Sequence, residues 1–147
     1  MSRVIAVANQ KGGVGKTTTA VNLAASLSAA EQRTLLIDGD PQGNATSGIG
    51  VREIGKTIYE VLLNEATIRE ARKVGEHFRL LDVLPATPDL AGAEIELVDL
   101  PQREQRMRSA LAPIRDEYDF ILIDCPPSLR RITINMLAAA DALIIPL

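Results

Sequence analysis

The sequence predicts one α/β domain over residues 1–147, built on a doubly wound, mainly parallel sheet. Two observations lead to this fold class. Short apolar runs alternate along the chain with longer helical patterns, which is typical of a parallel sheet with crossover helices. A glycine-rich segment also separates the first apolar run from the first helical pattern. Right-handed crossovers would gather the loops that follow the strands at one edge of the sheet, where ligands bind.

The expected strands are five short apolar runs bounded by turn residues. They cover residues 4–8, 34–38, 80–84, 120–124 and 142–146. The expected helices are longer segments with helical spacing of apolar residues. They cover residues 16–30, 57–64, 66–73, 103–116 and 132–140. Residues 43–55 contain several glycines and small polar side chains, and we expect them to form a mobile loop.

Composition excludes several functional classes. The net charge is −3, with sixteen basic and nineteen acidic residues, so bulk charge does not indicate a nucleic-acid-binding protein. A single cysteine, Cys125, excludes an internal disulfide framework and a cluster of metal thiolates. The most apolar stretch, residues 132–147, is too short to span a bilayer and is interrupted by Asn135 and Asp141. We expect a cytoplasmic protein without membrane contact.

The strongest motif is the segment NQKGGVGKTT at residues 9–18. Its glycines allow successive backbone N–H groups to turn inward around a polyphosphate, and Lys16 supplies a positive charge. The hydroxyl of Thr17 is suited to Mg²⁺ bridging two phosphates. A simple glycine-rich turn is the alternative, but the strand before the segment and the helix after it favour nucleotide binding. The expected nucleotide-binding residues are Lys11, Gly12, Gly13, Val14, Gly15, Lys16, Thr17 and Thr18.

Acidic residues follow two of the expected strands. Asp124 closes the run FILID, an arrangement typical of a carboxylate that holds Mg²⁺ through water at a strand terminus. It could instead cap the next turn, but Pro126 and Pro127 make immediate helix formation unfavourable. Asp38 and Asp40 flank a glycine after the second expected strand. Their spacing alone does not assign them separate roles.

The second lysine of the loop, Lys11, makes the segment KGGVGKTT similar to the deviant Walker A loop of the ParA/Soj-type partition ATPases. The blocks DGDPQGNAT, LPATPDLAGAE and FILIDCPPSL resemble the same branch. The resemblance runs from about Val4 to Leu147 and lacks the family's last third. Two neighbouring branches fit less well: the nitrogenase iron protein needs a second cysteine, and the septum-site ATPases carry a C-terminal membrane helix that is not seen here.

The resemblance implies an ATPase that hydrolyses ATP to ADP and phosphate, uses Mg²⁺, and times the segregation of chromosomes or plasmids. Lys11 would reach the phosphates of a partner subunit, so homodimerisation would depend on the nucleotide. Asp40 would orient the attacking water, and Asp38 would lie nearer to Mg²⁺. The expected catalytic residues are Lys11, Lys16 and Asp40, and the expected metal-site residues are Thr17, Asp38, Asp40 and Asp124. The segments 42–46 and 126–128 would sense the γ-phosphate.

The resemblance also implies a ParB-like centromere-binding partner, location at the bacterial nucleoid and non-specific DNA binding. DNA binding by this chain is doubtful, because the family's basic residues for DNA lie beyond Leu147. Two arginine groups remain, at residues 103–108 and 130–131, and a solvated surface is the favoured interpretation of both. Arg130 and Arg131 replace the usual glycine and apolar residue of the family. The competing hypothesis is a non-catalytic fragment that binds nucleotide without turnover.

Overall fold

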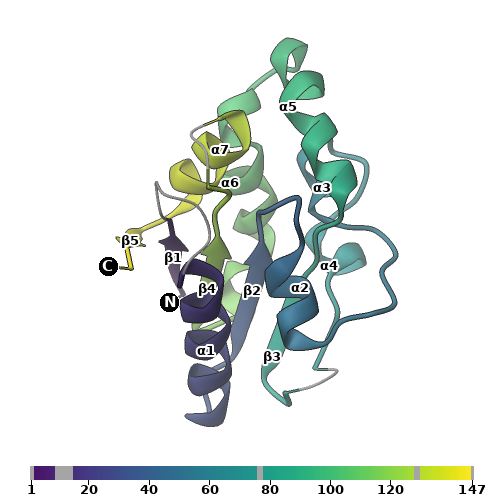
Figure 1. Ribbon diagram of the computed structural model, residues 1–147. Helices are drawn as coiled ribbons and strands as arrows, with labels where there is room; N and C mark the ends of the chain where they lie inside the picture. Colours follow the sequence, from purple (N-terminus) through teal and green to yellow (C-terminus); the bar gives the residue numbers. More distant parts are fainter. Residues whose placement is uncertain (1, 9–14, 76–77, 128–129, 147) are drawn as a thin grey trace.

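The computed structural model describes residues 2–8, 15–75, 78–127 and 130–146, and these form five parallel strands in one sheet (Figure 1). The strand order is β3-β2-β4-β1-β5. The strands are β1 (Arg3–Val7), β2 (Thr34–Asp38), β3 (Leu81–Leu84), β4 (Phe120–Asp124) and β5 (Ala142–Ile144). The predicted fold class is therefore confirmed, and each strand lies where an apolar run predicted it, with small shifts at the ends of β1, β3 and β5.

The helices are mostly short. The α-helices are α1 (Lys16–Ala29), α2 (Asn44–Ile49), α3 (Ile58–Leu62), α4 (Ile68–Ala71), α5 (Ala93–Glu96), α6 (Arg106–Leu111) and α7 (Arg131–Ala139). The 3₁₀ turns are η1 (Pro88–Gly92), η2 (Leu97–Asp99), η3 (Arg103–Gln105) and η4 (Ala112–Glu117). Within the described ranges, no helix has the length and apolar character needed to cross a bilayer.

Local signals explain where several helices begin and end. Capping boxes start α3 and α4: the side chains of Thr57 and Thr67 accept backbone hydrogen bonds, and Glu60 and Glu70 accept from the cap N–H groups. The single helix expected over residues 103–116 is instead divided into η3, α6 and η4. Pro113 lies at the start of η4, where it cannot donate the N–H that an α-helix would need.

The prediction of a mobile loop over residues 43–55 is partly wrong, because α2 occupies the first half of this segment. Gly43 and Gly50 flank this helix with φ angles of 68° and 94°, in the left-handed region that favours glycine. Three side chains of α2 are buried, namely Ala45, Thr46 and Ile49. Glycines that suggested mobility in the sequence are therefore the two caps of a packed helix.

Helices cover both faces of the sheet, as expected for a doubly wound domain. On one face α1 and α2 pack on the sheet, and their buried residues form a cluster with Leu36 and Leu122. Residues of α3 to α7 pack on the other face, in a cluster that includes Leu35 and Ile121. Figure 1 shows the two helical layers on either side of the strands. Together the clusters form the core on each side of the sheet.

The sheet register brings three strand ends together. Asp124 pairs with Val7 on one side and with Asp38 on the other. Side chains alternate along a strand, so Asp38 and Asp124 point to the same face as Leu36 and Leu122 two residues earlier, the face that carries α1 and α2. Residues that are far apart in sequence therefore meet beside the N-termini of these two helices.

Of the three arginines at residues 103–108, Arg103 and Arg108 are exposed and Arg106 is buried. Arg106 is 8% exposed, and its guanidinium donates to the carbonyl oxygens of Pro101 at 3.1 Å and Leu62 at 3.2 Å. Arg103 donates to the carbonyl oxygen of Val98 at 2.7 Å. The expectation of a solvated helix face is therefore wrong for Arg106, which fixes α6 against its neighbours.

Candidate nucleotide-binding site

The loop after β1 enters α1 through Gly15. This residue is the N-cap of α1 and has a φ angle of 82°, which a residue with a side chain rarely adopts. No atom of the described residues lies within 4 Å of the position where a Cβ would lie, so among these residues the backbone angle is what favours glycine. Lys11, Gly12, Gly13 and Val14 lie outside the described residues. Thr18 lies in the first turn of α1 and is exposed.

Lys16 is the first residue of α1, and its side chain is fully buried. Its Nζ atom donates a hydrogen bond to Oδ1 of Asp124 and lies 3.9 Å from Oδ2 of Asp40. It also lies 3.4 Å from Oγ1 of Thr17. A buried ammonium group is costly unless opposite charges and hydrogen bonds surround it. In this chain the carboxylate of Asp124, at the end of β4, and that of Asp40, in the turn after β2, provide that compensation.

Asp124, at the end of β4, is buried and uses both carboxylate oxygens. Oδ1 accepts from Lys16, and Oδ2 accepts from the hydroxyl of Thr17 at 2.9 Å. Burial raises the pKa of this carboxyl group, and the charge of Lys16 and the two hydrogen bonds act in the opposite direction. Asp124 thus connects β4 directly to the first turn of α1.

Asp40 lies in the turn between β2 and α2 and is 6% exposed. Its Oδ1 atom accepts from the N–H of Gln42 at 3.0 Å, while Oδ2 faces Lys16. Its carbonyl oxygen accepts from the N–H of Gly43 at 2.9 Å. The structure therefore brings Asp40 to the same lysine as Asp124.

Asp38 is buried beside these residues but contacts a different group. Its carboxylate accepts hydrogen bonds from the N–H of Asp40 and from both the N–H and the hydroxyl of Thr46. Burial raises the pKa of Asp38 to about 6, and the hydrogen bonds from Thr46 and Asp40 oppose that rise. No local pattern distinguishes Thr46 from its neighbours in the segment 42–46, because its contact with Asp38 depends on how α2 packs.

A cavity of about 240 Å³ lies next to Asp40, between the turn after β2 and the start of α7. Its lining includes Gln42, Pro126 and Pro127, which belong to the two segments expected to sense a phosphate, and also Arg130. Ser128, in the second segment, lies outside the described residues. The structure thus places Arg130, which departs from the family pattern, beside the same cavity as Asp40.

Glu94 is a further residue at this cavity that sequence reasoning missed. Its carboxylate accepts from the N–H groups of Arg131 at 3.1 Å and Ile132 at 2.9 Å, so it caps the N-terminus of α7 from α5. A carboxylate that caps a helix normally lies just before that helix in sequence. Glu94 lies 37 residues before Arg131, so no local pattern could identify it.

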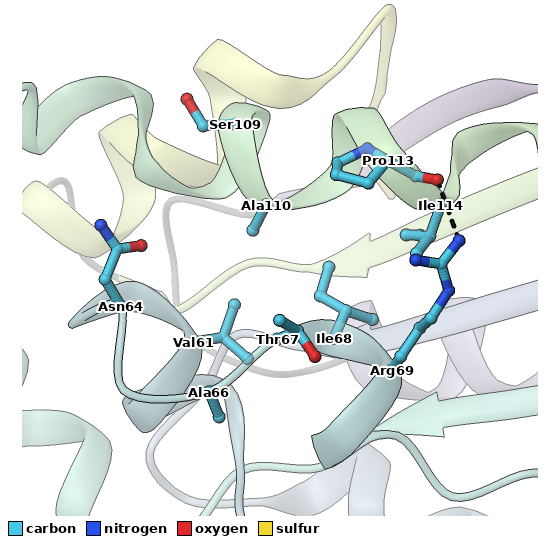
Figure 2. A pocket seen from close by; sticks show the side chains of 10 residues that line it. All are labelled: Val61, Asn64, Ala66, Thr67, Ile68, Arg69, Ser109, Ala110, Pro113 and Ile114. Atoms are coloured by element: carbon cyan, nitrogen blue, oxygen red, sulfur yellow. Dashed lines mark hydrogen bonds between the residues drawn. The ribbon is translucent and has the colours of Figure 1, made fainter.

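A second cavity, of about 230 Å³, lies away from these residues, between α3–α4 and α6–η4 (Figure 2). Figure 2 shows that Val61, Ile68 and Ile114 face it, while the guanidinium of Arg69 donates to the carbonyl oxygen of Pro113 at 3.2 Å. No titratable group of the candidate site lines it. This cavity is therefore separate from the candidate nucleotide-binding site.

The donor set fits a nucleotide phosphate with one hard cation. Lys16 offers a buried positive charge, and Thr17 and Asp124 offer adjacent oxygen atoms, which are the ligands that Mg²⁺ prefers. Among the described residues there is no group of three or more histidine, cysteine, aspartate or glutamate side chains that could hold a metal by themselves. A cation here would need phosphate oxygens and water as further ligands, as Mg²⁺ commonly has.

A parallel sheet with a lysine-containing loop at the carboxyl end of its central strands defines the class of P-loop nucleotide-binding domains. A family model described as an AAA domain matches residues 2–147. The chain belongs to this family, and it is similar to partition proteins of the ParA/Soj type.

Three similar proteins illustrate the relationship. The chromosome partitioning protein ParA of Myxococcus xanthus is 60% identical over all of this chain and 52% of its own length. The sporulation initiation inhibitor protein Soj of Bacillus subtilis is 51% identical over 99% of this chain and 58% of its own. A solved structure named cobyrinic acid a,c-diamide synthase, from Mycobacterium smegmatis, contains ADP and magnesium. It is 43% identical over 100% of this chain and 60% of its own, with a TM-score of 0.94.

The same Mycobacterium smegmatis protein has also been solved with an ATP analogue and magnesium. The chain spans about half the length of the curated relatives it matches. The names of these relatives refer to different biological processes. Similarity over residues 1–147 therefore identifies a nucleotide-binding domain but not the process in which the protein takes part.

Proposed function

We propose that this chain binds MgATP and hydrolyses it to ADP and phosphate, as part of a nucleotide-dependent dimerisation switch for chromosome or plasmid partitioning. One observation carries the proposal: a fully buried lysine, Lys16, held between Asp124 and Asp40 at the N-terminus of α1. A buried charge of this kind is expensive to maintain for structure alone. It is suited to a group that exchanges its carboxylate partners for phosphates when nucleotide binds.

In this proposal Lys16 and the loop amides of residues 11–16 bind the β- and γ-phosphates. The hydroxyl of Thr17 and the carboxylate of Asp124 hold Mg²⁺, with Asp40 nearby as a further oxygen donor. Bound Mg²⁺ would neutralise negative charge on the phosphate oxygens. Asp38, the fourth metal residue expected from the sequence, makes a different set of contacts and is not included in this set.

Hydrolysis requires that a water oxygen forms a bond to the γ-phosphorus while the bond to the bridging β–γ oxygen breaks. Asp40 lies beside Lys16 and lines a cavity, so it can orient a water molecule by accepting a hydrogen bond from it. Lys11 would act from a second copy of the chain, where its charge would stabilise the phosphoryl oxygens. Dimerisation, a ParB-like partner and nucleoid association rest on the family resemblance.

A phosphate-release assay with the purified chain, ATP and Mg²⁺ tests turnover directly. We expect slow release that depends on Mg²⁺ and is lost in the Lys16→Ala variant. Analytical ultracentrifugation with a non-hydrolysable ATP analogue tests the dimer in parallel. Binding of ATP without phosphate release would instead support the competing hypothesis, a nucleotide-binding fragment that has no turnover.

We expect duplex DNA to bind weakly, in contrast to full-length relatives of this type. Non-specific binding comes from lysines and arginines that neutralise phosphates, and log K falls by about 0.9 per contact per log unit of salt. The guanidinium of Arg106 donates hydrogen bonds to the carbonyl oxygens of Leu62 and Pro101 inside the protein, so it is not available to DNA phosphates. The guanidinium of Arg131 donates to the carbonyl oxygen of Glu94. If Arg130 and Arg131 were the usable pair, the slope would be about −2.

A gel-shift titration with ATP and Mg²⁺ across a salt series measures this slope. We expect no retained DNA at a physiological ionic strength of about 0.15 M. An Arg130→Ala, Arg131→Ala double variant serves as the control and should flatten the remaining salt dependence at low ionic strength. Tight binding with a steep slope would contradict the prediction and indicate a basic surface assembled in the dimer.

A further inference from the structure

The turn between β2 and α2 is fixed at more points than its glycine-rich sequence suggests. The N–H of Gly39 donates to the carbonyl oxygen of Asp124 at 2.8 Å, which joins the turn to β4. A Cβ at Gly39 would lie 2.7 Å from that same oxygen, so only glycine permits this approach. At the other end of the turn, a Cβ at Gly43 would lie 3.1 Å from the carbonyl oxygen of Ala86. The turn therefore lies closely against the ends of two neighbouring strands.

Asp38 makes the central contacts of this arrangement. Its Oδ1 atom accepts from the N–H of Asp40 at 3.1 Å. Its Oδ2 atom accepts from the N–H of Thr46 at 2.8 Å and from the Thr46 hydroxyl at 2.7 Å. Asp38 is completely buried, and a buried carboxylate is retained at a cost unless its hydrogen bonds are satisfied. These three bonds occupy most of the roughly four acceptor sites of a carboxylate.

Thr46 extends the connection to a third strand. Its hydroxyl donates to Asp38 and at the same time accepts from the N–H of Ala86, just beyond β3, at 3.0 Å. One hydroxyl thus links the ends of β2 and β3 through the first turn of α2. Because both contacts are buried, loss of the hydroxyl would remove the acceptor of the Ala86 N–H and one of the three hydrogen bonds to Asp38.

We propose that Asp38 is a positioning residue, whose carboxylate, with Thr46, holds Asp40 in the orientation that its role in hydrolysis requires. It acts through the Asp40 backbone and the start of α2 and does not organise Mg²⁺. The proposal rests on the function proposed for Asp40, but its structural part stands independently of turnover. Thr46, which the sequence indicated only as part of the segment 42–46, would then have a specific role in ordering this turn.

Two variants separate positioning from metal binding. Asp38→Asn places an amide donor where the carboxylate accepts from Thr46 or Asp40, so one of these bonds must fail. Thr46→Val keeps the shape of the side chain and removes the hydroxyl. The matched control is Ser47→Ala, which lies on the same helix and is exposed. Thr46→Ser restores the hydroxyl and is the rescue variant.

Phosphate release and nucleotide titration give the functional measurement. For Asp38→Asn and Thr46→Val we expect kcat to fall by about tenfold or more, with KM and the Mg²⁺ half-saturation concentration within about twofold of the parent. Thr46→Ser should recover most of the lost turnover. If Asp38 organised Mg²⁺, the half-saturation concentration would rise strongly in Asp38→Asn and remain unchanged in Thr46→Val, and this result would overturn the proposal.

Amide hydrogen exchange of the nucleotide-free chain gives a measurement that does not need ATP turnover. We expect exchange over residues 40–46 to accelerate by about tenfold in Asp38→Asn and Thr46→Val, corresponding to the loss of one buried hydrogen bond. Ser47→Ala should leave this segment near the parent rate. Unchanged exchange in both variants would overturn the proposal. A parent chain without phosphate release would refute the proposed function alone, and the exchange data would still decide whether Asp38 orders this turn.

Discussion

Replacing Lys16 with alanine should abolish ATP binding at micromolar nucleotide concentrations. Hydrogen bonds to charged groups contribute about 1.5–3 kcal/mol each, and about 1.4 kcal/mol corresponds to a tenfold change in affinity. Lys16 would make at least two such contacts with the β- and γ-phosphates, so we expect a loss of about 100-fold or more. Equilibrium titration with a fluorescent ATP analogue in the presence of Mg²⁺ measures this loss.

The control for this experiment must separate lost binding from lost folding. Removal of Lys16 leaves Asp124 buried without its cation, which destabilises the folded state. Circular dichroism therefore has to establish that the variant is folded before its affinity is interpreted. Lys56→Ala removes the same charge from an exposed position and should bind normally. Normal affinity in a folded Lys16→Ala variant would rule out the phosphate-binding assignment.

Asp40→Ala should retain MgATP and lose most hydrolysis. Its proposed role is to hold water and not phosphate, and general acid–base groups of this kind typically contribute about 10²–10⁴ in rate. We therefore expect a fall of at least about 100-fold in single-turnover hydrolysis. Nucleotide affinity should stay equal or increase, because a negative charge 3.9 Å from Lys16 is removed.

Asp40→Asn provides the matched control for loop geometry. The amide oxygen can still accept from the N–H of Gln42, so the turn keeps its shape while the charge is lost. Slow hydrolysis in both variants would indicate a role for the carboxylate itself. Slow hydrolysis in Asp40→Ala alone would assign Asp40 to loop structure, and parent rates in both variants would remove it from the mechanism.

The sequence predicts most reliably those features that depend on local pattern. The strands over residues 34–38 and 120–124 match β2 and β4 residue for residue, because buried parallel strands are short apolar runs with few alternatives. Gly15 and Lys16 follow from a motif whose spacing the phosphate chemistry imposes. The proximity of Asp38, Asp40 and Asp124 follows from the edge at which parallel strands end.

The features that the sequence did not predict depend on tertiary contacts. The helix α2 is flanked by Gly43 and Gly50 and contains Thr46, residue types that by themselves favour a loop. The helix is stabilised by its buried side chains and by the hydrogen bonds of Asp38 to Thr46. Glu94 caps a helix 37 residues away, and Arg106 binds carbonyl groups of segments that are distant in sequence. In each case a polar side chain has a partner that only the packed fold supplies. For the same reason the sequence indicated a metal role for Asp38 but not its contacts with Thr46 in α2.

The position of β1 between β4 and β5 has a consequence for how the chain folds. β1 does not pair with β2, the next strand in sequence, and Lys16 and Asp124 are separated by 108 residues. Bringing together residues that are so far apart in sequence costs chain entropy before their contacts contribute any stabilisation. Topologies with many such contacts therefore fold slowly. The candidate site is therefore complete only once β4 has joined β1. A nucleotide that binds only this completed form would stabilise it by about 2.7 kcal/mol at a concentration one hundred times its dissociation constant.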